Sequence, residues 1–569
     1  MIALYAPTLG RGLVNYEDPW LVADNWIVQQ PSWASLHAIF LDTSRATRFV
    51  LGAEYLPVRD LSVMLDFALW GDWYPGFHIT NLVIYLASIG LWFAVLEGFG
   101  LDRKLTGLAI LFWALHPSHA ESVSWLSQRK DLLGLMFAGL AGLAYVRFRV
   151  GRSASWLALA VVATLATVWS KSPFAFAIAA LGALELVLPA LRVSWRRSLV
   201  GLGAIALVGV SAFVPVLAVA FHNAIVSPTA HAPVGFFEMA IGLHGFYLRL
   251  AAMTLHNAAT YPIIDGPSWI EIAIGAVGLA CMSGVLVAPR RLRMSPALRA
   301  GAILWLSGWL PVSRLVLPLR IVQVADHYIL FPTLGLALAL AVGVTAIASK
   351  RARYALIIVV AVAASMRTFD AQSNWRDSRT LWERAVASNP TDGNAWSIYS
   401  ESLMDAGDPQ AAMEAVSAGL KRSRAPRLLM RKALLVLQYG KNRSAAEDAM
   451  RAAADGGEPR AMTNLALLYF EDRKFDAALQ YARRATAIAP SYAHGHRIVG
   501  KIALATQHPD EALAAFQSAY SLAPLDLANR YNLALALIEL NRRDEARPFL
   551  EACLSDPVLV DRARKALGL

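Results

Sequence analysis

Two adjacent carboxylates near the start of the chain are the first candidates for chemistry. Glu17 and Asp18 lie in the sequence NYEDPWLVADN, directly before a proline. One carboxylate of such a pair could take a proton from a hydroxyl group while the other orients it or a ligand. The simpler interpretation is that the two acids end a solvated loop, so the pair gains weight only from the residues that it meets in the fold.

A second polar segment, HPSHAESVSWLSQRKD, begins at His116. His116, His119 and Glu121 have helical spacings that would also suit a metal site. Pro117 disturbs the helix that would align them, and no further strong ligand follows at a suitable spacing, so we predict no metal site here. We expect these side chains, together with Asp131, to form hydrogen bonds within a polar pocket.

Isolated cations occur in the same kind of loop. Arg129, Lys171 and Arg320 lie between apolar runs. Charged residues at the edge of a membrane are costly and tend to be functional. Cations there could stabilise a departing phosphate, which leaves as a weakly basic anion and needs no strong general acid. Contact with solvent or lipid headgroups is the alternative for each residue.

The composition indicates which environment must position these residues. The chain has 569 residues, of which 57% are hydrophobic and 16% charged, whereas an ordinary soluble domain is about 25% charged. These numbers exclude a disordered chain and favour a membrane protein. Cys281 and Cys553 lie in different kinds of segment, so a disulfide framework is excluded. The Lys and Arg residues that give the net charge of +11 gather at the ends of apolar runs, so this charge reflects membrane topology. We therefore predict no nucleic-acid partner.

The apolar and charged residues divide the chain near Arg367. Long apolar runs fill residues 1–369, whereas residues 370–569 are charged and rich in alanine. We therefore predict an all-α protein with a polytopic membrane domain followed by a helical repeat domain. Runs of about 20 apolar residues or slightly fewer can cross a bilayer. Candidate spans lie near residues 78–97, 104–116, 131–147, 153–170, 172–190, 198–220, 268–288, 297–312, 328–347 and 353–369.

Short basic clusters between alternate spans predict the orientation. Loops rich in Lys and Arg stay on the cytoplasmic side. This places the acidic pair, the HPSHAE segment and the repeat domain on the opposite side, and the composition favours a bacterial inner membrane with the repeats in the periplasm. The clusters are Arg103/Lys104, Arg147/Arg149/Arg152, Arg192/Arg196/Arg197, Arg290/Arg291/Arg293/Arg299 and Lys350/Arg351/Arg353.

Two segments interrupt this alternation. Residues 236–256 are long enough to cross, but both flanks must face outward, so we predict an interfacial or re-entrant helix with Arg249 near lipid headgroups. A full span, with another span misassigned, is the alternative. The stretch before Asn15 is too short for a span or a signal peptide, and the topology predicts that a preceding span is missing.

A period of 34 residues marks the second region. Asp476, Asp510 and Asp544 are 34 residues apart, and Pro490 and Pro524 keep the same period. A helical period of this length with a closing proline is typical of tetratricopeptide repeats. Five copies, the second degenerate, would stack into a superhelix whose concave face binds peptides or proteins. The repeats supply no chemistry of their own.

These segments resemble the transmembrane-and-tetratricopeptide O-mannosyltransferases and their bacterial relatives, within the polyprenyl-phosphate-dependent GT-C glycosyltransferases. The most specific match is HPSHAESVSWLSQRKDLL. NYEDPWLVADN, YLPVRDLSV and GFHITNLVIYLAS precede it, and WSKSPF, YPIIDG, ADHYILFPTLG and NWRDSRTLWERAVASNP follow in the family's order.

The resemblance implies transfer of a mannose-like sugar from a polyprenyl phosphate to a hydroxyl, with inversion, on the non-cytoplasmic face. The acceptor would be Ser or Thr of a protein, and the repeats would bind that protein. The donor is a substrate and not a cofactor; whether a divalent metal joins the acids, and which acid is the base, stays open. By this comparison the catalytic acids are Glu17 and Asp18, the pocket residues are His116, His119, Glu121 and Asp131, and our candidates for the donor phosphate are Arg129, Lys171 and Arg320.

Three positions depart from the family pattern. Residue 17 is Glu where the family's pair is Asp-Asp, Ser172 stands where an acid often follows the lysine, and His327 stands where an arginine is common. The extra methylene of Glu17 moves its carboxylate by about 1.5 Å, which matters for a reaction that needs near-attack geometry. Two alternatives therefore stay open: a catalytically inactive, membrane-anchored repeat scaffold for envelope assembly, and a transferase that builds a lipid-linked glycan.

Overall fold

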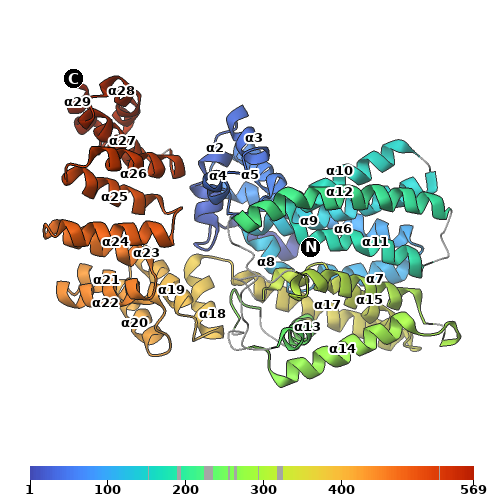
Figure 1. Cartoon of the computed structure of the whole chain (residues 1–569). Helices are drawn as coiled ribbons and strands as arrows, with labels where there is room; N and C mark the ends of the chain where they lie inside the picture. Colours follow the sequence, from blue (N-terminus) through green and yellow to red (C-terminus); the bar gives the residue numbers. More distant parts are fainter. Residues whose placement is uncertain are drawn as a thin grey trace. The chain divides into compact units, whose positions relative to one another are not determined.

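The computed structural model describes residues 1–151, 153–188, 194–222, 235–253, 257–261, 266–292, 294–316, 324–524 and 526–569. Within these residues the chain forms helices and no strand, so the predicted all-α fold is confirmed (Figure 1). Two compact units are present. Residues 1–43 and 51–388 form the first, and residues 44–50 and 389–569 form the second. The first unit thus extends past residue 370, where the composition changes.

Five stretches of the first unit are long and apolar enough to cross a membrane, counting the described residues only. They are Tyr74–Gly98, Leu126–Gly151, Trp195–Phe221, Trp269–Val287 and Lys350–Ser373. Large apolar side chains are exposed on all five, as at Val83, Val150, Val210, Val277 and Val359. Exposed apolar surface of this extent is typical of contact with lipid, so these helices associate with a membrane.

The five stretches contain the long helices α6 (Tyr74–Gly98), α9 (Arg129–Gly151), α12 (Trp195–His222), α14 (Trp269–Val287) and α17 (Lys350–Ser373). Shorter apolar helices are α10 (Ala154–Ser170), α11 (Ala175–Val187) and α16 (Thr333–Thr345).

Four predicted spans coincide with helices that are too short to cross alone. α7 (Arg103–Ala114) has 12 residues, α15 (Pro296–Trp309) has 14, and α11 and α16 have 13 each. At about 1.5 Å per residue these helices rise roughly 18 to 21 Å, which is less than the hydrocarbon thickness of about 30 Å. The number of complete crossings and their direction therefore stay predictions.

The segment expected at the interface forms α13 (Phe236–Ala251), which packs tightly along α14. A Cβ atom on Gly245 would lie 1.8 Å from the Glu271 carbonyl oxygen. Only glycine allows two helix backbones to approach so closely. Arg249, expected near headgroups, has its Nη1 3.1 Å from Oε1 of Glu271. One partner of this cation is therefore a carboxylate of the protein.

Short helices around the long ones carry the candidate site residues. The acidic pair lies directly before a single π-turn at Pro19–Ala23. The HPSHAE segment forms α8, and the WSKSPF segment lies where α10 ends. The short helices of the first unit are α1 (Ile2–Tyr5), α2 (Trp26–Gln29), α3 (Trp33–Phe40), α5 (Pro57–Trp70), α8 (His119–Ser124) and α18 (Ser378–Ser388).

The second unit consists of five helix pairs and a final helix, α29 (Val560–Leu567), together with α4 (Arg45–Val50). The degenerate second copy forms a regular pair, α21 with α22, because its small buried residues such as Ala446 and Ala453 are kept. The pairs are α19 (Gly393–Asp405) with α20 (Pro409–Leu420), α21 (Pro426–Gln438) with α22 (Arg443–Asp455), α23 (Pro459–Glu471) with α24 (Phe475–Ile488), α25 (Ala493–Ala505) with α26 (Pro509–Leu522) and α27 (Leu527–Glu539) with α28 (Arg543–Ala552).

Candidate functional site

A cavity of about 490 Å³ in the first unit brings together polar residues that are distant in sequence. The acid-pair segment, the HPSHAE segment, the WSKSPF segment and the residues around His327 all contribute to its wall. Its charged and polar lining residues are Tyr16, Glu17, Glu54, Glu121, Gln128, Lys130, Lys171, Ser172, His327 and Tyr328.

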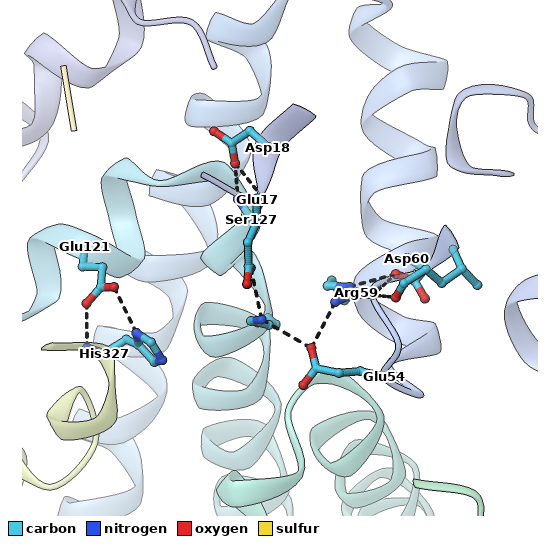
Figure 2. A network of polar contacts seen from close by, with 10 residues as sticks. Glu17, Asp18, Glu54, Arg59, Asp60, Glu121, Ser127 and His327 are labelled. Atoms are coloured by element: carbon cyan, nitrogen blue, oxygen red, sulfur yellow. Dashed lines mark hydrogen bonds and ion pairs between the residues drawn. The ribbon is translucent and has the colours of Figure 1, made fainter. Parts of the chain in front are cut away.

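Glu17 faces this cavity, and its side chain is 28% exposed. Its Oε2 lies 3.5 Å from Nζ of Lys130, and the same Nζ lies 3.4 Å from Oε2 of Glu54. Nη1 of Arg59 contacts this Glu54 oxygen at 3.4 Å, and Nη2 of Arg59 lies 2.7 Å from Oδ1 of Asp60 (Figure 2). Alternating charges thus hold a carboxylate and an ammonium group in fixed positions at the cavity wall.

Glu54 and Arg59 belong to the site, although they were not singled out from the sequence. Burial alone would raise the pKa of Glu54, but the positive charges of Lys130, Lys171 and Arg59 outweigh it and lower that pKa to about 2. Glu54 therefore stays ionised and holds Lys130 in place. The sequence carries a signal for Glu54, which is an isolated charge between Ala53 and Tyr55, whereas Arg59 is followed directly by Asp60.

Asp18 points away from the cavity and is 1% exposed. Its Oδ1 accepts hydrogen bonds from the backbone N–H of Ser127 at 3.0 Å and from Ser127 Oγ at 2.6 Å, and its Oδ2 accepts one from the Val14 N–H at 3.0 Å (Figure 2). Burial raises the pKa of Asp18 to about 6, and these hydrogen bonds oppose the rise. The geometry assigns Asp18 to fixing the loop that presents Glu17.

Asp18→Asn is expected to destabilise the first unit. The amide keeps one acceptor oxygen but places an N–H group against a buried donor, which costs about 1–3 kcal/mol. The pKa of Asp18 is about 6 in the folded chain and about 3.9 in an unfolded one, so the folded state binds its proton more tightly. This pKa difference adds up to about 3 kcal/mol to the free energy of unfolding. The contribution is fully present below about pH 4 and is lost as the pH rises through about 6.

Thermal unfolding of the full chain in detergent measures this effect. The Tm difference between the unchanged chain and Asp18→Asn is expected to be larger at about pH 5 than at about pH 7.5. An equal difference at both pH values would contradict the assignment of this titration to Asp18.

Glu121 and His327 form a buried pair at another wall of the cavity. Oε1 of Glu121 lies 3.1 Å from Nδ1 of His327, and Oε2 accepts a hydrogen bond from the His327 backbone N–H at 3.0 Å (Figure 2). Burial raises the pKa of Glu121 and lowers the pKa of His327 to about 3. The His327 ring is therefore uncharged at pH 7, so the position that is commonly arginine in the resembling family carries no cation here.

Lys171 and Asp131 lie beside this pair. Both line a small space of about 30 Å³ that also touches His327 and Tyr328, and Lys171 lines the larger cavity as well. Lys130 and Lys171 thus supply two cations to one polar region.

His116 and His119 have their own partners away from this cavity. His116 contacts Ser118 Oγ through Nδ1 at 2.7 Å and the Ala251 carbonyl through Nε2 at 2.9 Å. It lines a separate, apolar cavity of about 510 Å³. His119 contacts the Tyr85 hydroxyl at 2.8 Å and Thr333 Oγ1 at 3.1 Å. Their hydrogen bonds connect helices, so they support the pocket from a distance.

Arg129 is buried between helices and does not line the cavity. Its Nη2 lies 2.5 Å from Oδ2 of Asp66, its Nε donates to Asn81 Oδ1 at 2.7 Å and Nη2 donates to the Phe77 carbonyl at 2.9 Å. These bonds fasten α9 to α5 and α6. The neighbouring residue Lys130 is at the cavity in its place. Arg320 lies outside the described residues.

No group of three or more His, Cys, Asp or Glu side chains that could hold a metal ion occurs in the part of the chain that the structure describes. The helical spacing of His116, His119 and Glu121 does not bring them together around one point, because each has separate partners.

An apolar groove of about 370 Å³ adjoins the charged cavity. Phe176 and Phe213 line both spaces. From there the groove passes between α10, α11 and α12, past residues such as Ile178, Gly182 and Leu202. A polar cavity and an apolar groove thus lie next to each other and share two phenylalanine side chains.

Comparisons with known proteins identify the repeat region. Tetratricopeptide-repeat family models match residues 367–426, 430–493 and 503–557, so the C-terminal region consists of these repeats. A repeat structure titled "Crystal structure of YrrB: a TPR protein with an unusual peptide-binding site" is 17% identical, covers 32% of this chain and 97% of that one, and has a TM-score of 0.26.

Curated relatives are named as O-mannosyl-transferases. Protein O-mannosyl-transferase Tmtc1 of Drosophila melanogaster is 28% identical over 191 residues, which is 33% of this chain and 22% of the relative. TMTC2 of Mus musculus is 26% identical over 26% of this chain and 18% of the relative. TMTC4 of Homo sapiens is 32% identical over 16% of this chain and 15% of the relative. The matches span less than a quarter of each relative, and they confirm the predicted resemblance to this family.

Proposed function

We propose, from the similarity to these protein O-mannosyl-transferases, that the chain is a membrane glycosyltransferase that moves a mannose-like sugar from a polyprenyl phosphate to a hydroxyl. One observation carries the proposal: a cavity with a carboxylate, Glu17, and two cations, Lys130 and Lys171, lies beside an apolar groove that shares Phe176 and Phe213 with it. A hydroxyl acceptor needs the base, a phosphate needs the cations, and an isoprenoid chain needs the groove.

Glu17 is the proposed general base. Its carboxylate takes the hydroxyl proton while the acceptor oxygen attacks C1 of the sugar from the face opposite the phosphate. The bond from C1 to the phosphate oxygen breaks, and the polyprenyl phosphate leaves with the electron pair. Attack from the opposite face inverts C1. Lys130 and Lys171 stabilise the negative charge that develops on the phosphate in this enclosed site.

The acceptor in this proposal is Ser or Thr of a protein that the repeats bind. The site lies on the non-cytoplasmic face of a bacterial inner membrane, with the repeats in the periplasm. Distribution of the basic clusters supports this orientation.

The donor class is tested with the purified full chain in detergent. We would supply a radiolabelled mannose either as polyprenyl-phosphate mannose or as a nucleotide sugar, together with solubilised envelope proteins. Label in protein from the polyprenyl phosphate alone is the expected result. Incorporation from the nucleotide sugar alone would contradict the donor assignment, and incorporation from neither would favour a scaffold.

Lys171→Met is expected to raise the KM for the donor by about 10- to 100-fold. A lost charge-assisted contact to the phosphate costs about 1.5–3 kcal/mol, and each 1.4 kcal/mol is about tenfold in affinity. Lys350→Met, at the exposed start of α17, is the matched control and should change neither KM nor kcat. A donor KM for Lys171→Met within about twofold of the control would remove Lys171 from the phosphate site.

A further inference from the structure

The first helices of several repeats carry cations along one exposed face. α21 carries Arg427 and Arg431, α23 carries Arg460, and α25 carries Arg497 and Lys501. The four-residue spacing within each pair keeps both side chains on one side of the helix. Cations therefore continue from one repeat to the next and are not scattered over the unit.

This face lies on the inner side of the superhelix. In the described repeat region, helices that are two apart along the chain make their most extensive contacts in the pairs α19–α21, α23–α25 and α25–α27. All of these are the first helices of their repeats. First helices that pack on one another lie on the concave side of such a stack. Lys501 of α25 also interacts electrostatically with Arg562 of α29, beyond the intervening α27, as an inward-facing surface allows.

Acidic residues neutralise only part of this face. Glu401 of α19 contacts Arg431 at 2.7 Å and Arg427 at 3.9 Å, and Asp526 contacts Arg497 at 2.6 Å. Asp526 also accepts a hydrogen bond from the backbone at the start of α27, so its charge is shared between two partners.

Other cations on this face have no carboxylate within ion-pair distance. Within residues 389–524 and 526–569, Arg460, Lys501 and Arg562 make no ion pair. Burial and the positive charges of Arg497 and Arg562 lower the pKa of Lys501. Burial, Arg497 and Lys501 lower the pKa of His494 to about 4. The potential at this part of the surface is therefore positive.

The concave face is not basic throughout. Asp405, Glu471 and Glu539 lie in the last turns of α19, α23 and α27, about ten residues or roughly 15 Å further along each helix. The cations accordingly form a stripe along one edge of the face, crossing the first helices near their N-terminal halves.

We propose that this basic stripe, formed by Arg427, Arg431, Arg460, Arg497, Lys501 and Arg562, docks an acidic, extended segment of a partner protein. The inference rests on the part of the proposed function that gives the repeats a protein partner, and it adds the chemistry of that partner. Carboxylates of the segment would supply the counter-charges that Arg460, Lys501 and Arg562 lack, through charge-assisted hydrogen bonds.

The geometry also sets the spacing of those carboxylates. Packed helices lie about 8–10 Å apart, and an extended peptide advances about 3.3 Å per residue. An acidic residue at about every third position therefore matches successive first helices. Because the stripe is exposed to solvent, binding should weaken as salt screens it.

Fluorescence anisotropy with the full chain in detergent tests this proposal. The probe is a labelled 15-residue peptide with Asp or Glu at every third position, compared with the same peptide carrying Asn or Gln there. We expect at least about tenfold tighter binding of the acidic peptide and a loss of that advantage above about 0.3 M salt. Arg460→Glu/Lys501→Glu should abolish it, whereas Lys501→Arg should keep it.

Two controls separate the stripe from other causes. Arg543 and Arg547 are both exposed on the second helix α28, so Arg543→Glu/Arg547→Glu changes the net charge by the same amount elsewhere and should bind normally. Equal affinity for both peptides, or an effect of Arg543→Glu/Arg547→Glu as large as that of the stripe variant, overturns the proposal. Stripe-dependent binding to vesicles with anionic phospholipid, without peptide binding, would also overturn it and assign the stripe to a membrane surface.

Binding is measured without donor, so its outcome is independent of the chemistry. The Glu17→Gln variant should bind the acidic peptide normally. If the unchanged chain binds the acidic peptide but transfers no sugar, only the glycosyltransferase proposal is contradicted. If it transfers sugar but does not bind the peptide, only the proposal for the stripe is contradicted.

Discussion

Glu17→Gln is expected to lower kcat for sugar transfer by about 10²- to 10⁴-fold, the range that a general base contributes. The amide cannot accept the acceptor's proton. Glu17 is partly exposed and its side chain contacts Lys130 at 3.5 Å, so the variant should fold. The measurement is the initial rate of label transfer from polyprenyl-phosphate mannose at saturating donor, with Tm recorded in parallel.

Two further variants make this result specific. Glu97 pairs with Arg103 at the end of α6, away from the cavity, so Glu97→Gln is the matched control and should leave kcat unchanged. Glu17→Asp keeps the base but shortens the side chain, and an intermediate rate is expected. If Glu17→Gln retains a rate within about twofold of the control, Glu17 is not the base.

Trp382→Ala in the full-length chain is expected to reduce kcat by about 10²-fold, although Trp382 does not line the cavity. Displacement of a reacting group by about 1 Å can cost this much. Trp382 belongs to α18 and acts through the segment that carries Glu17. The same transfer assay measures the effect, and a KM for the donor close to that of the unchanged chain would show that positioning of the base is what is lost.

An aromatic stack transmits this positioning. Tyr16, next to Glu17, stacks on Trp125 with ring centroids 4.8 Å apart, and Trp125 stacks on Trp375 at 4.9 Å. Trp382 packs its edge on Tyr16 at 5.2 Å, and its Nε1 donates to Asn15 Oδ1 at 2.7 Å. Removing the indole therefore releases both residues that precede Glu17.

A graded series distinguishes positioning from general damage. Trp382→Phe keeps the ring but loses the hydrogen bond to Asn15, and it should recover most of the rate. Trp396→Ala, in α19 of the repeat unit, is a matched tryptophan control. A full rate for Trp382→Ala, or an equal loss for Trp396→Ala, would contradict a role of α18 in the site.

The helical class, the membrane association and the repeats could be predicted from the sequence because each depends on local composition or periodicity. Apolar runs and the 34-residue spacing of Asp476, Asp510 and Asp544 need no knowledge of distant contacts. The end of the first unit could not be predicted in this way. Composition changes near Arg367, but the chain after it still packs on the acid-pair segment through Trp375 and Trp382.

The residue types at the site were also within reach of the sequence, since charged residues in an apolar domain are rare and costly. Glu17, Glu121 and Lys171 were expected at the site, and they line one cavity. Glu54, between Ala53 and Tyr55, shows the same signal. Its contact with Lys130 joins residues that are 76 apart in the sequence, which no local pattern specifies.

What only the tertiary structure decided is which member of each adjacent pair faces the cavity. Glu17 and Lys130 do, whereas their neighbours Asp18 and Arg129 are buried on Ser127 and Asp66. Arg129 and Lys130 are consecutive residues of α9 and point about 100° apart, whereas Glu17 and Asp18 diverge from a turn. Which one does so depends on partners distant in sequence, and the sequence by itself determined the pairs but not that choice.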